Sequence, residues 1–277
     1  MSRTLYVSDM DGTLLGRDSQ LSSETVALLN RIINEHHALF TVATARTPAT
    51  VAPLMQQVNA TLPYIVIGGA AMWDSRTGEY RALRAIDNDT VSRVADAFEQ
   101  CNMHPFVYRR VGKLLMTHHW GPMTQQERQF IEERRHLPLK RMVLDDPDYR
   151  HSAGEALLIF AQDDYDRLRD IRDAVSHLEG CTVTLYHDIF DQRIGYFEVH
   201  SAGTSKASTI ARLAREAGAD RVVVFGDNRN DLPMMQAATL GIAVANAIDE
   251  VKVKADLVIG PNTEDSVPRW ILDDLRR

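Results

Sequence analysis

The sequence places two aspartates, Asp9 and Asp11, where a short apolar run ends in Gly12. Residues 5–7 have β character, and a glycine lets the backbone turn sharply after them. Because side chains alternate between the faces of a strand, both carboxylates would project together from its carboxyl end. In an open α/β sheet that edge is where ligands bind. Taken alone, however, the pair favours an acidic surface turn.

Further polar clusters have the same form as this first one. Each follows an apolar strand or stands at the start of a helix, and their residues are Thr44, Lys206, Asp227, Asn230 and Asp231. Singly, a threonine in such a place caps the next helix, and a lysine is a solvated surface group. It is their recurrence along the chain that favours a functional interpretation over an acidic turn.

The elements that would position these clusters alternate between strands and helices at both ends of the chain. The predicted strands are residues 5–7, 38–44, 64–67, 222–225, 241–244 and 257–259. Strand-helix alternation implies right-handed crossovers and a parallel sheet. The sequence therefore predicts an α/β fold with a Rossmann-like, doubly wound parallel-sheet core.

The middle of the chain lacks this alternation. A hairpin is predicted around Gly112, and the strands and helices that follow it have no regular order, which indicates an α+β insert. The predicted organisation is a discontinuous core domain, residues 1–82 and 194–277, with an inserted domain at residues 83–193.

Composition limits the possible partners and location. The chain has 277 residues, 44% hydrophobic and 25% charged, as is usual for soluble globular proteins. A net charge of −7 argues against a nucleic-acid partner. We find no apolar run long enough to span a bilayer and no signal-peptide pattern, so no membrane partner is predicted. Two cysteines, Cys101 and Cys181, do not suggest a disulfide framework, and a cytoplasmic location is expected.

Four segments resemble the motifs of one known family. Residues 9–14, Asp-Met-Asp-Gly-Thr-Leu, resemble motif I of the haloacid dehalogenase-like superfamily, and residues 226–231 match every fixed position of its motif IV. Thr44 and Lys206 stand where motifs II and III place a hydroxyl and a lysine. The insert resembles the C2-type cap of the Cof-type, subfamily IIB phosphatases. The likeness extends over nearly the whole chain.

This resemblance implies a role for each matching residue. Asp9 is expected to be the nucleophile that becomes aspartyl-phosphate, and Asp11 the general acid and base. The residues expected to bind phosphate are Met10, Thr44, Ala45, Lys206 and Asn230. Asp231 is expected to support the waters of a metal ion or Lys206.

A bound cation is predicted from charge. A phosphate dianion beside Asp9, Asp11 and Asp227 would suffer several repulsions of about 4 kcal/mol each, and Lys206 supplies one positive charge. Oxygen ligands that leave room for waters suit Mg²⁺. The resemblance implies carboxylate ligands from Asp9 and Asp227, and the backbone carbonyl of Asp11.

The sequence departs from the family pattern at two positions. Ala45 replaces a common glycine and stays among the expected phosphate contacts, whereas Gly68 replaces a common asparagine, so the contact of that side chain in relatives is not carried over. Arg46 is expected to cap or pair locally. Candidate substrate contacts in the insert are His187, Asp188 and Arg193, for which an exposed loop is the alternative.

The predicted activity is Mg²⁺-dependent hydrolysis of a small phosphorylated metabolite, a sugar phosphate or a similar phosphomonoester. A phosphomutase of the same superfamily is an alternative, although it needs a second phosphate position. A non-enzymatic switch that keeps a phosphorylated aspartate is another, against which Asp11 argues because a nearby acid and base favours turnover. The sequence does not predict the oligomeric state.

Overall fold

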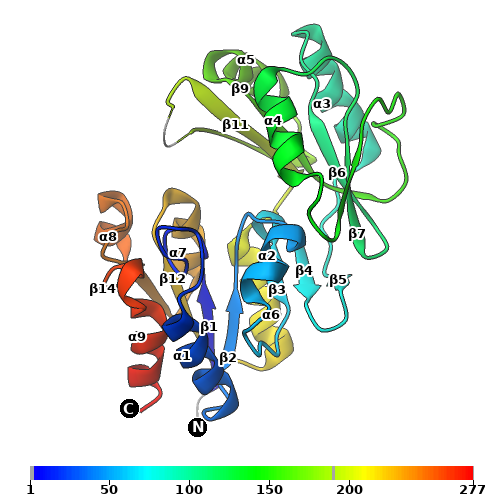
Figure 1. The fold of residues 1–277 in the computed structure, drawn as a ribbon. Helices are drawn as coiled ribbons and strands as arrows, with labels where there is room; N and C mark the ends of the chain where they lie inside the picture. The colour runs from blue at the N-terminus through cyan, green and yellow to red at the C-terminus, as the bar shows by residue number, and fades with distance from the viewer. Residues whose placement is uncertain (1–2, 189–190, 277) are drawn as a thin grey trace. The chain divides into compact units, whose positions relative to one another are not determined.

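The computed structural model describes residues 3–188 and 191–276, and it divides the chain into two compact units. We call the first the core unit; it consists of Met1–Arg81 and Ser205–Arg277. The second, Ala82–Thr204, is the inserted unit. The core unit is thus made of both ends of the chain, coloured blue to cyan and yellow to red in Figure 1.

The core unit contains a parallel sheet in the order β14-β13-β12-β1-β2. Its strands are β1 (Thr4–Ser8), β2 (Leu39–Val42), β12 (Arg221–Gly226), β13 (Leu240–Val244) and β14 (Leu257–Ile259). Strand β1 lies between β12 and β2, and it is apolar and fully buried at Leu5 and Val7, as a strand covered on both faces must be. An antiparallel sheet of β3 (Tyr64–Val66), β4 (Ala71–Asp74) and β5 (Glu79–Arg81) follows β2.

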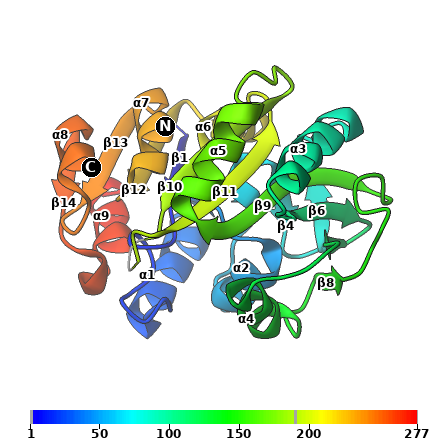
Figure 2. The same cartoon turned by 90° about the horizontal axis from the view of Figure 1, so that it is seen from above.

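Helices cover both faces of the parallel sheet. They are α1 (Ser23–Asn34), α2 (Pro48–Met55), α6 (Lys206–Ala217), α7 (Leu232–Ala237), α8 (Asp249–Lys254) and α9 (Ser266–Asp274). Helix α1 packs beside α9 and α6 beside α7, and Figure 2 shows the strands between these two pairs. Amphipathic sequence explains the packing: α1 begins at the cap Ser22 and buries Leu29, Ile32 and Ile33. The predicted doubly wound α/β core is confirmed.

The inserted unit is built on a second sheet, in the order β10-β11-β9-β6-β7-β8. Its strands are β6 (Phe106–Val111), β7 (Leu114–His118), β8 (Lys140–Val143), β9 (Glu155–Asp164), β10 (Cys181–His187) and β11 (Ile194–Ser201). Pairing is antiparallel except between β7 and β8. The predicted hairpin is present, with Val111 opposite Leu114.

The two faces of this sheet are covered by different helices. Helices α3 (Asn88–Gln100) and α5 (Tyr165–Val175) share a buried apolar cluster with Ile159 of β9. Helix α4 (Gln125–Arg134) instead contacts Phe160, the residue that follows Ile159 in β9, through the ring of Phe130. Because neighbouring residues of a strand point to opposite faces, α4 lies on the face opposite α3 and α5.

The inserted unit extends beyond the boundary predicted from sequence. That boundary, at residue 193, precedes β11, but β11 pairs with β9 and β10 and the unit runs on to Thr204. Strand β11 alternates between half-buried and buried residues, as expected of a strand in an antiparallel sheet rather than in the parallel core.

In the described part of the chain, no helix is long and apolar enough to cross a membrane.

Candidate active site

The polar clusters predicted from sequence meet at the carboxyl ends of three adjacent strands. Asp9 follows β1, Thr44 follows β2, and Asp227 follows β12, and these strands are neighbours in the parallel sheet. The backbone N–H of Asp9 donates to the carbonyl of Phe225 at 2.9 Å, so the end of β1 is held directly against the end of β12.

Lys206 links the first and last of these clusters. Its Nζ lies 2.5 Å from Oδ1 of Asp9 and 2.7 Å from Oδ1 of Asp231, and all three side chains are buried. Lys206 is the first residue of α6, where Ser205 caps the helix by accepting from the N–H of Ser208. Burial opposes the charge of Lys206, but the two carboxylates outweigh it and hold the pKa of Lys206 above its ordinary value.

The site carries more negative than positive charge. Burial raises the pKa of Asp9, the nearby Asp231 and Asp227 raise it further, and Lys206 opposes them. Burial is also the main cause that raises the pKa of Asp227 to about 6, with Thr13 opposing it by donating to Oδ1 at 2.7 Å. A further cation would relieve this excess of negative charge.

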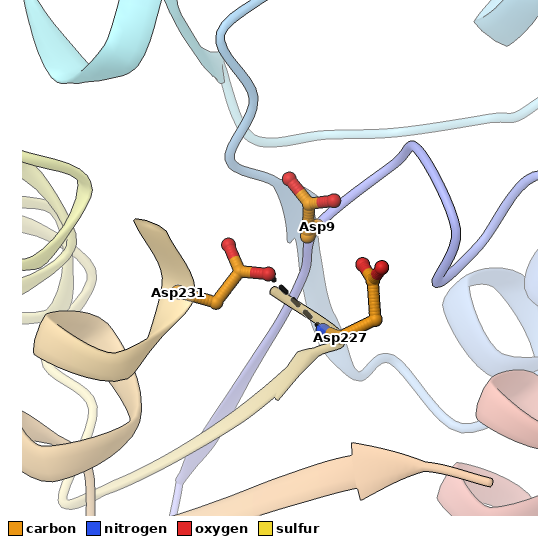
Figure 3. A group of neighbouring side chains, drawn as sticks. All are labelled: Asp9, Asp227 and Asp231. Atoms are coloured by element: carbon orange, nitrogen blue, oxygen red, sulfur yellow. Dashed lines mark hydrogen bonds between the residues drawn. The ribbon is translucent and has the colours of Figure 1, made fainter. Parts of the chain in front are cut away.

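Carboxylate oxygens of Asp9, Asp227 and Asp231 lie within 4.8 Å of one another, an arrangement that could hold a metal ion. Figure 3 shows them together, with the N–H of Asp227 donating to Asp231. Both oxygens of Asp231 have partners: Oδ1 accepts from Lys206, and Oδ2 accepts from the N–H groups of Asp227 and Asn228. Asp9 and Asp227 are therefore better placed as ligands than Asp231, and such a hard oxygen set fits a divalent cation.

Gly12 allows the turn after β1 to approach Asp227. Its φ is +76°, in the left-handed region, and a Cβ at this position would collide with the Asp227 carboxylate. The carbonyl of Gly12 also accepts from Nδ2 of Asn246 at 2.7 Å. Sequence reasoning missed Asn246, although its place just after the predicted strand at residues 241–244 was a usable signal.

Asp11 is held by Arg46 rather than by the buried cluster. Arg46 Nε donates to Oδ2 at 2.8 Å, and Nη2 donates to Oδ1 at 2.6 Å. Arg46 thus pairs with a residue 35 positions away in sequence, not with the local partner expected from the sequence. The buried hydroxyl of Thr44 accepts from the N–H of Arg46 at 3.1 Å, which fixes the turn after β2.

The remaining predicted phosphate contacts lie at the same edge of the sheet. The side chain of Met10 is buried, and its carbonyl accepts backbone N–H groups that shape the turn after β1. Ala45 and Asn230 are exposed residues after β2 and β12. Gly68 donates its N–H to the carbonyl of Thr44 at 3.0 Å, so it adjoins the site through its backbone.

The three predicted contacts in the inserted unit lie at the turn between β10 and β11. His187 stacks on Tyr165, with ring centroids 3.6 Å apart. Asp188 accepts from the hydroxyl of Tyr196 at 2.9 Å. Arg193 pairs with Asp191, and its side chain is 85% exposed. Local partners thus hold all three.

Comparison with known proteins connects these motifs to a family. The sequence model of the haloacid dehalogenase-like hydrolase family matches residues 6–271 of this chain. A 5-amino-6-(5-phospho-D-ribitylamino)uracil phosphatase of Bacillus subtilis is 25% identical, over 96% of each chain. A pyridoxal phosphate phosphatase of Escherichia coli is 27% identical, over 99% of this chain and all of its own.

A solved structure of a sugar phosphatase, described as subclass IIB, matches with a TM-score of 0.72. It covers 99% of both chains at 19% identity, which shows a shared fold. The family match spans nearly all of the chain, in agreement with the motifs. The chain therefore belongs to the haloacid dehalogenase-like hydrolase family, and both relatives named here as phosphatases are similar to it over nearly its full length.

Proposed function

We propose that this protein is a Mg²⁺-dependent phosphatase that hydrolyses a small phosphorylated metabolite through a phosphorylated Asp9. The observation that supports this most directly is Lys206, which bridges Asp9 and Asp231 beside Asp227 at the end of β1. A buried carboxylate held by a lysine at a ligand-binding edge suits nucleophilic attack on a phosphoryl group.

The proposed reaction has two steps. Asp9 attacks phosphorus and forms an acyl phosphate, while Asp11 gives a proton to the leaving oxygen of the ester. Asp11 then takes a proton from water, which attacks the same phosphorus and releases phosphate, so that Asp9 is restored. Lys206 neutralises charge that develops on the phosphoryl oxygens. Mg²⁺ held by Asp9, the Asp11 carbonyl and Asp227 would supply further positive charge there.

The inserted unit is proposed to be the cap that selects the substrate. The two curated relatives are named for phosphate esters whose leaving groups contain a uracil ring or a pyridoxal ring. We therefore propose a phosphomonoester with a flat nitrogen heterocycle as the preferred substrate class. A cytoplasmic location is part of the same proposal, because the free thiols of Cys101 and Cys181 suit a reducing compartment.

The test is to quench a reaction with acid, to digest the protein, and to measure the mass of the peptide that contains Asp9 by mass spectrometry. In the Asp11→Asn variant the acyl phosphate should accumulate, because both proton transfers are impaired, and the peptide should gain the mass of one phosphoryl group. The wild type should release phosphate with many turnovers. A rearranged ester in place of free phosphate would indicate a phosphomutase. A wild-type acyl phosphate that persists without turnover would indicate a switch.

A further inference from the structure

Strand β14, at one edge of the core sheet, is apolar and exposed. In the described part of the chain it is the last strand of the sheet and pairs only with β13. Leu257 and Val258 are 40% and 45% exposed. Edge strands are usually shielded by a charged residue, a proline or a covering element, because their free backbone groups can pair with another chain. Strand β14 contains neither a charge nor a proline, so its edge is open to such pairing.

The free edge of β14 presents hydrogen-bonding groups of the backbone. Just before the strand, Asp256 donates its N–H to the carbonyl of Gly241 at 2.8 Å. Just after it, the carbonyl of Gly260 accepts from the N–H of the residue that follows β13, at 3.2 Å. Both flanking residues thus face β13, and the direction of the backbone groups alternates along a strand. The N–H and C=O groups of Leu257 and Ile259 therefore point to the free edge.

The apolar surface continues onto α8, the helix that precedes β14. Val253 is 83% exposed, although Val251 on the same helix is buried. Ile248, at the start of this helix, is also exposed. Together with Leu257 and Val258, these residues give one short segment of the chain several exposed apolar side chains. Such a concentration indicates a contact site, whereas single apolar residues spread over a surface do not.

The charges of α8 are arranged by sign along the helix. Asp249 and Glu250 occupy the first turn, and Lys252 and Lys254 occupy the last. Within the helix, Lys254 pairs with Glu250 at 2.9 Å and Lys252 pairs with Asp249 at 3.5 Å. These pairs are open to solvent, so they contribute little to the stability of a single chain. A second α8 that runs in the opposite direction would place its basic end beside this acidic end.

A two-fold axis perpendicular to the sheet satisfies the strand and the helix together. Antiparallel pairing of β14 with the same strand of a second copy puts Val258 at the axis, and Leu257 and Ile259 exchange N–H···O bonds across it. Helix α8 connects two neighbouring parallel strands, so it crosses one face of the sheet. The axis keeps both copies of α8 on that face and makes them antiparallel, which is the arrangement that their charges favour.

We propose that a second copy of this chain binds at β14 and α8, so that the protein forms a two-fold symmetric dimer with one continuous sheet through two core units. Because the same surface of each copy makes the contact, the dimer is closed and does not grow further. The contact is small, since β14 has only three residues, and this places the dimer among weak, reversible associations. None of these residues belongs to the candidate active site, so dimer formation is independent of the proposed phosphatase function.

Sedimentation velocity of the full chain at increasing concentration provides the test. The wild type should pass from monomer to dimer and no further. Val258→Lys sets two like charges against each other at the symmetry axis, and it should weaken association at least about tenfold. The matched control is Val111→Lys, because Val111 is a strand valine of the inserted unit that is 41% exposed. That variant should dimerise as the wild type does.

Charge reversal on α8 tests the orientation of the two copies. Lys254→Asp sets acid against acid across the interface, and Asp249→Lys sets base against base, so each variant alone should associate at least about tenfold more weakly. An equimolar mixture of the two variants should recover dimers, because each aspartate then meets a lysine of the other copy. Circular dichroism and thermal unfolding should show that every variant is folded like the wild type.

The outcomes separate the parts of this interface. A wild type that stays monomeric at its highest soluble concentration would overturn the dimer, and so would equal effects of Val258→Lys and Val111→Lys. Charge variants that dimerise normally, or whose mixture does not recover dimers, would reject the antiparallel contact between the two α8 helices. Loss of dimers in Val258→Lys, together with their recovery in the mixture, would establish the proposed interface.

Discussion

Arg46 holds both carboxylate oxygens of Asp11, through Nε at 2.8 Å and Nη2 at 2.6 Å. Two parallel hydrogen bonds of this kind fix the plane of the carboxylate as well as its position. The Asp11 side chain is 54% exposed, so the pair contributes little to stability. Its effect is to orient the group proposed as general acid and base.

Replacing Arg46 with alanine should therefore lower kcat more than it changes KM. We expect kcat to fall about tenfold, a part of the roughly 10²–10⁴-fold that general acid–base catalysis contributes, and the free energy of unfolding to change by less than about 1 kcal/mol. Arg46→Lys, which cannot form the paired bonds, should be intermediate. Steady-state kinetics and urea unfolding provide the measurements. A tenfold rise in KM with kcat unchanged would mean that Arg46 binds substrate instead.

Asp9→Asn should abolish turnover without loss of structure. The amide is a poor nucleophile, and we expect kcat to fall at least about a thousandfold, as in other enzymes that lose their nucleophile. Asp18→Asn, an exposed aspartate a few residues later, is the control and should retain activity. Phosphate release measures the effect, with circular dichroism as the check on folding. Activity near that of wild type in Asp9→Asn would reject the assignment.

Lys206→Met should destabilise the core unit as well as stop catalysis. The change leaves Asp9 and Asp231 buried without their shared cation, a loss that costs about 3–5 kcal/mol for buried ion pairs. Lys252→Met removes a pair with Asp249 whose carboxylate is almost fully exposed, and it should cost less than about 1 kcal/mol. Urea unfolding of both variants makes the comparison. Equal costs would show that the buried bridge has no special energetic role.

Removal of divalent metal should inactivate the enzyme and lower its melting temperature. The proposed cation would bind the folded carboxylate cluster and not the unfolded chain, so added Mg²⁺ should raise Tm with concentration. Asp227→Asn should weaken that dependence, because the variant loses a carboxylate of the cluster. Differential scanning fluorimetry and activity after chelation are the readouts. Full activity in protein shown by elemental analysis to be metal-free would contradict the requirement.

The inserted unit should lose stability in mild acid through His119. Burial, followed by the nearby charge of His104, lowers the pKa of His119 to about 4. Because the folded pKa lies below the unfolded value of about 6.5, this stability is complete above pH 6.5 and declines as pH falls toward 4. The loss between pH 7 and pH 5 should be roughly 2 kcal/mol.

The variant that tests this is His119→Phe. Its larger apolar ring keeps the packing on Phe106 and cannot be protonated. Urea unfolding at pH 7 and pH 5 should show a smaller loss of stability in acid for His119→Phe than for wild type. An unchanged pH dependence would assign the acid sensitivity to other groups.

Sequence reasoning predicted the elements whose pattern is strong and local. The buried strands and the hairpin at Gly112 are examples, since runs of apolar residues and turn glycines do not depend on distant partners. Strands β4, β5 and β8 were not predicted. They are short, and at Lys140 a basic residue is buried only because Tyr108 and Phe130 surround its ammonium group. Tertiary contacts of that kind leave no periodic signal.

The residues of the candidate site also fall into two groups, those that contiguous motifs predicted and those whose contacts only the structure shows. Asp9, Lys206 and Asp227 could be identified because their motifs are contiguous, and the structure brings them together. The two bonds between Arg46 and Asp11, and the bond from Asn246 to Gly12, join residues far apart in sequence and required coordinates.

The position of β1 between β2 and β12 in the parallel sheet governs how the protein can fold during synthesis. One neighbour, β2, follows it closely, but the other, β12, comes from the far part of the chain, with Thr4 opposite Arg221. Ala82–Thr204 is continuous and leaves the ribosome before β12, so it can fold while β1 still has one open edge. Asp9 therefore meets Lys206 only late in translation, and a nascent chain truncated before α6 carries the nucleophile without its charge partner.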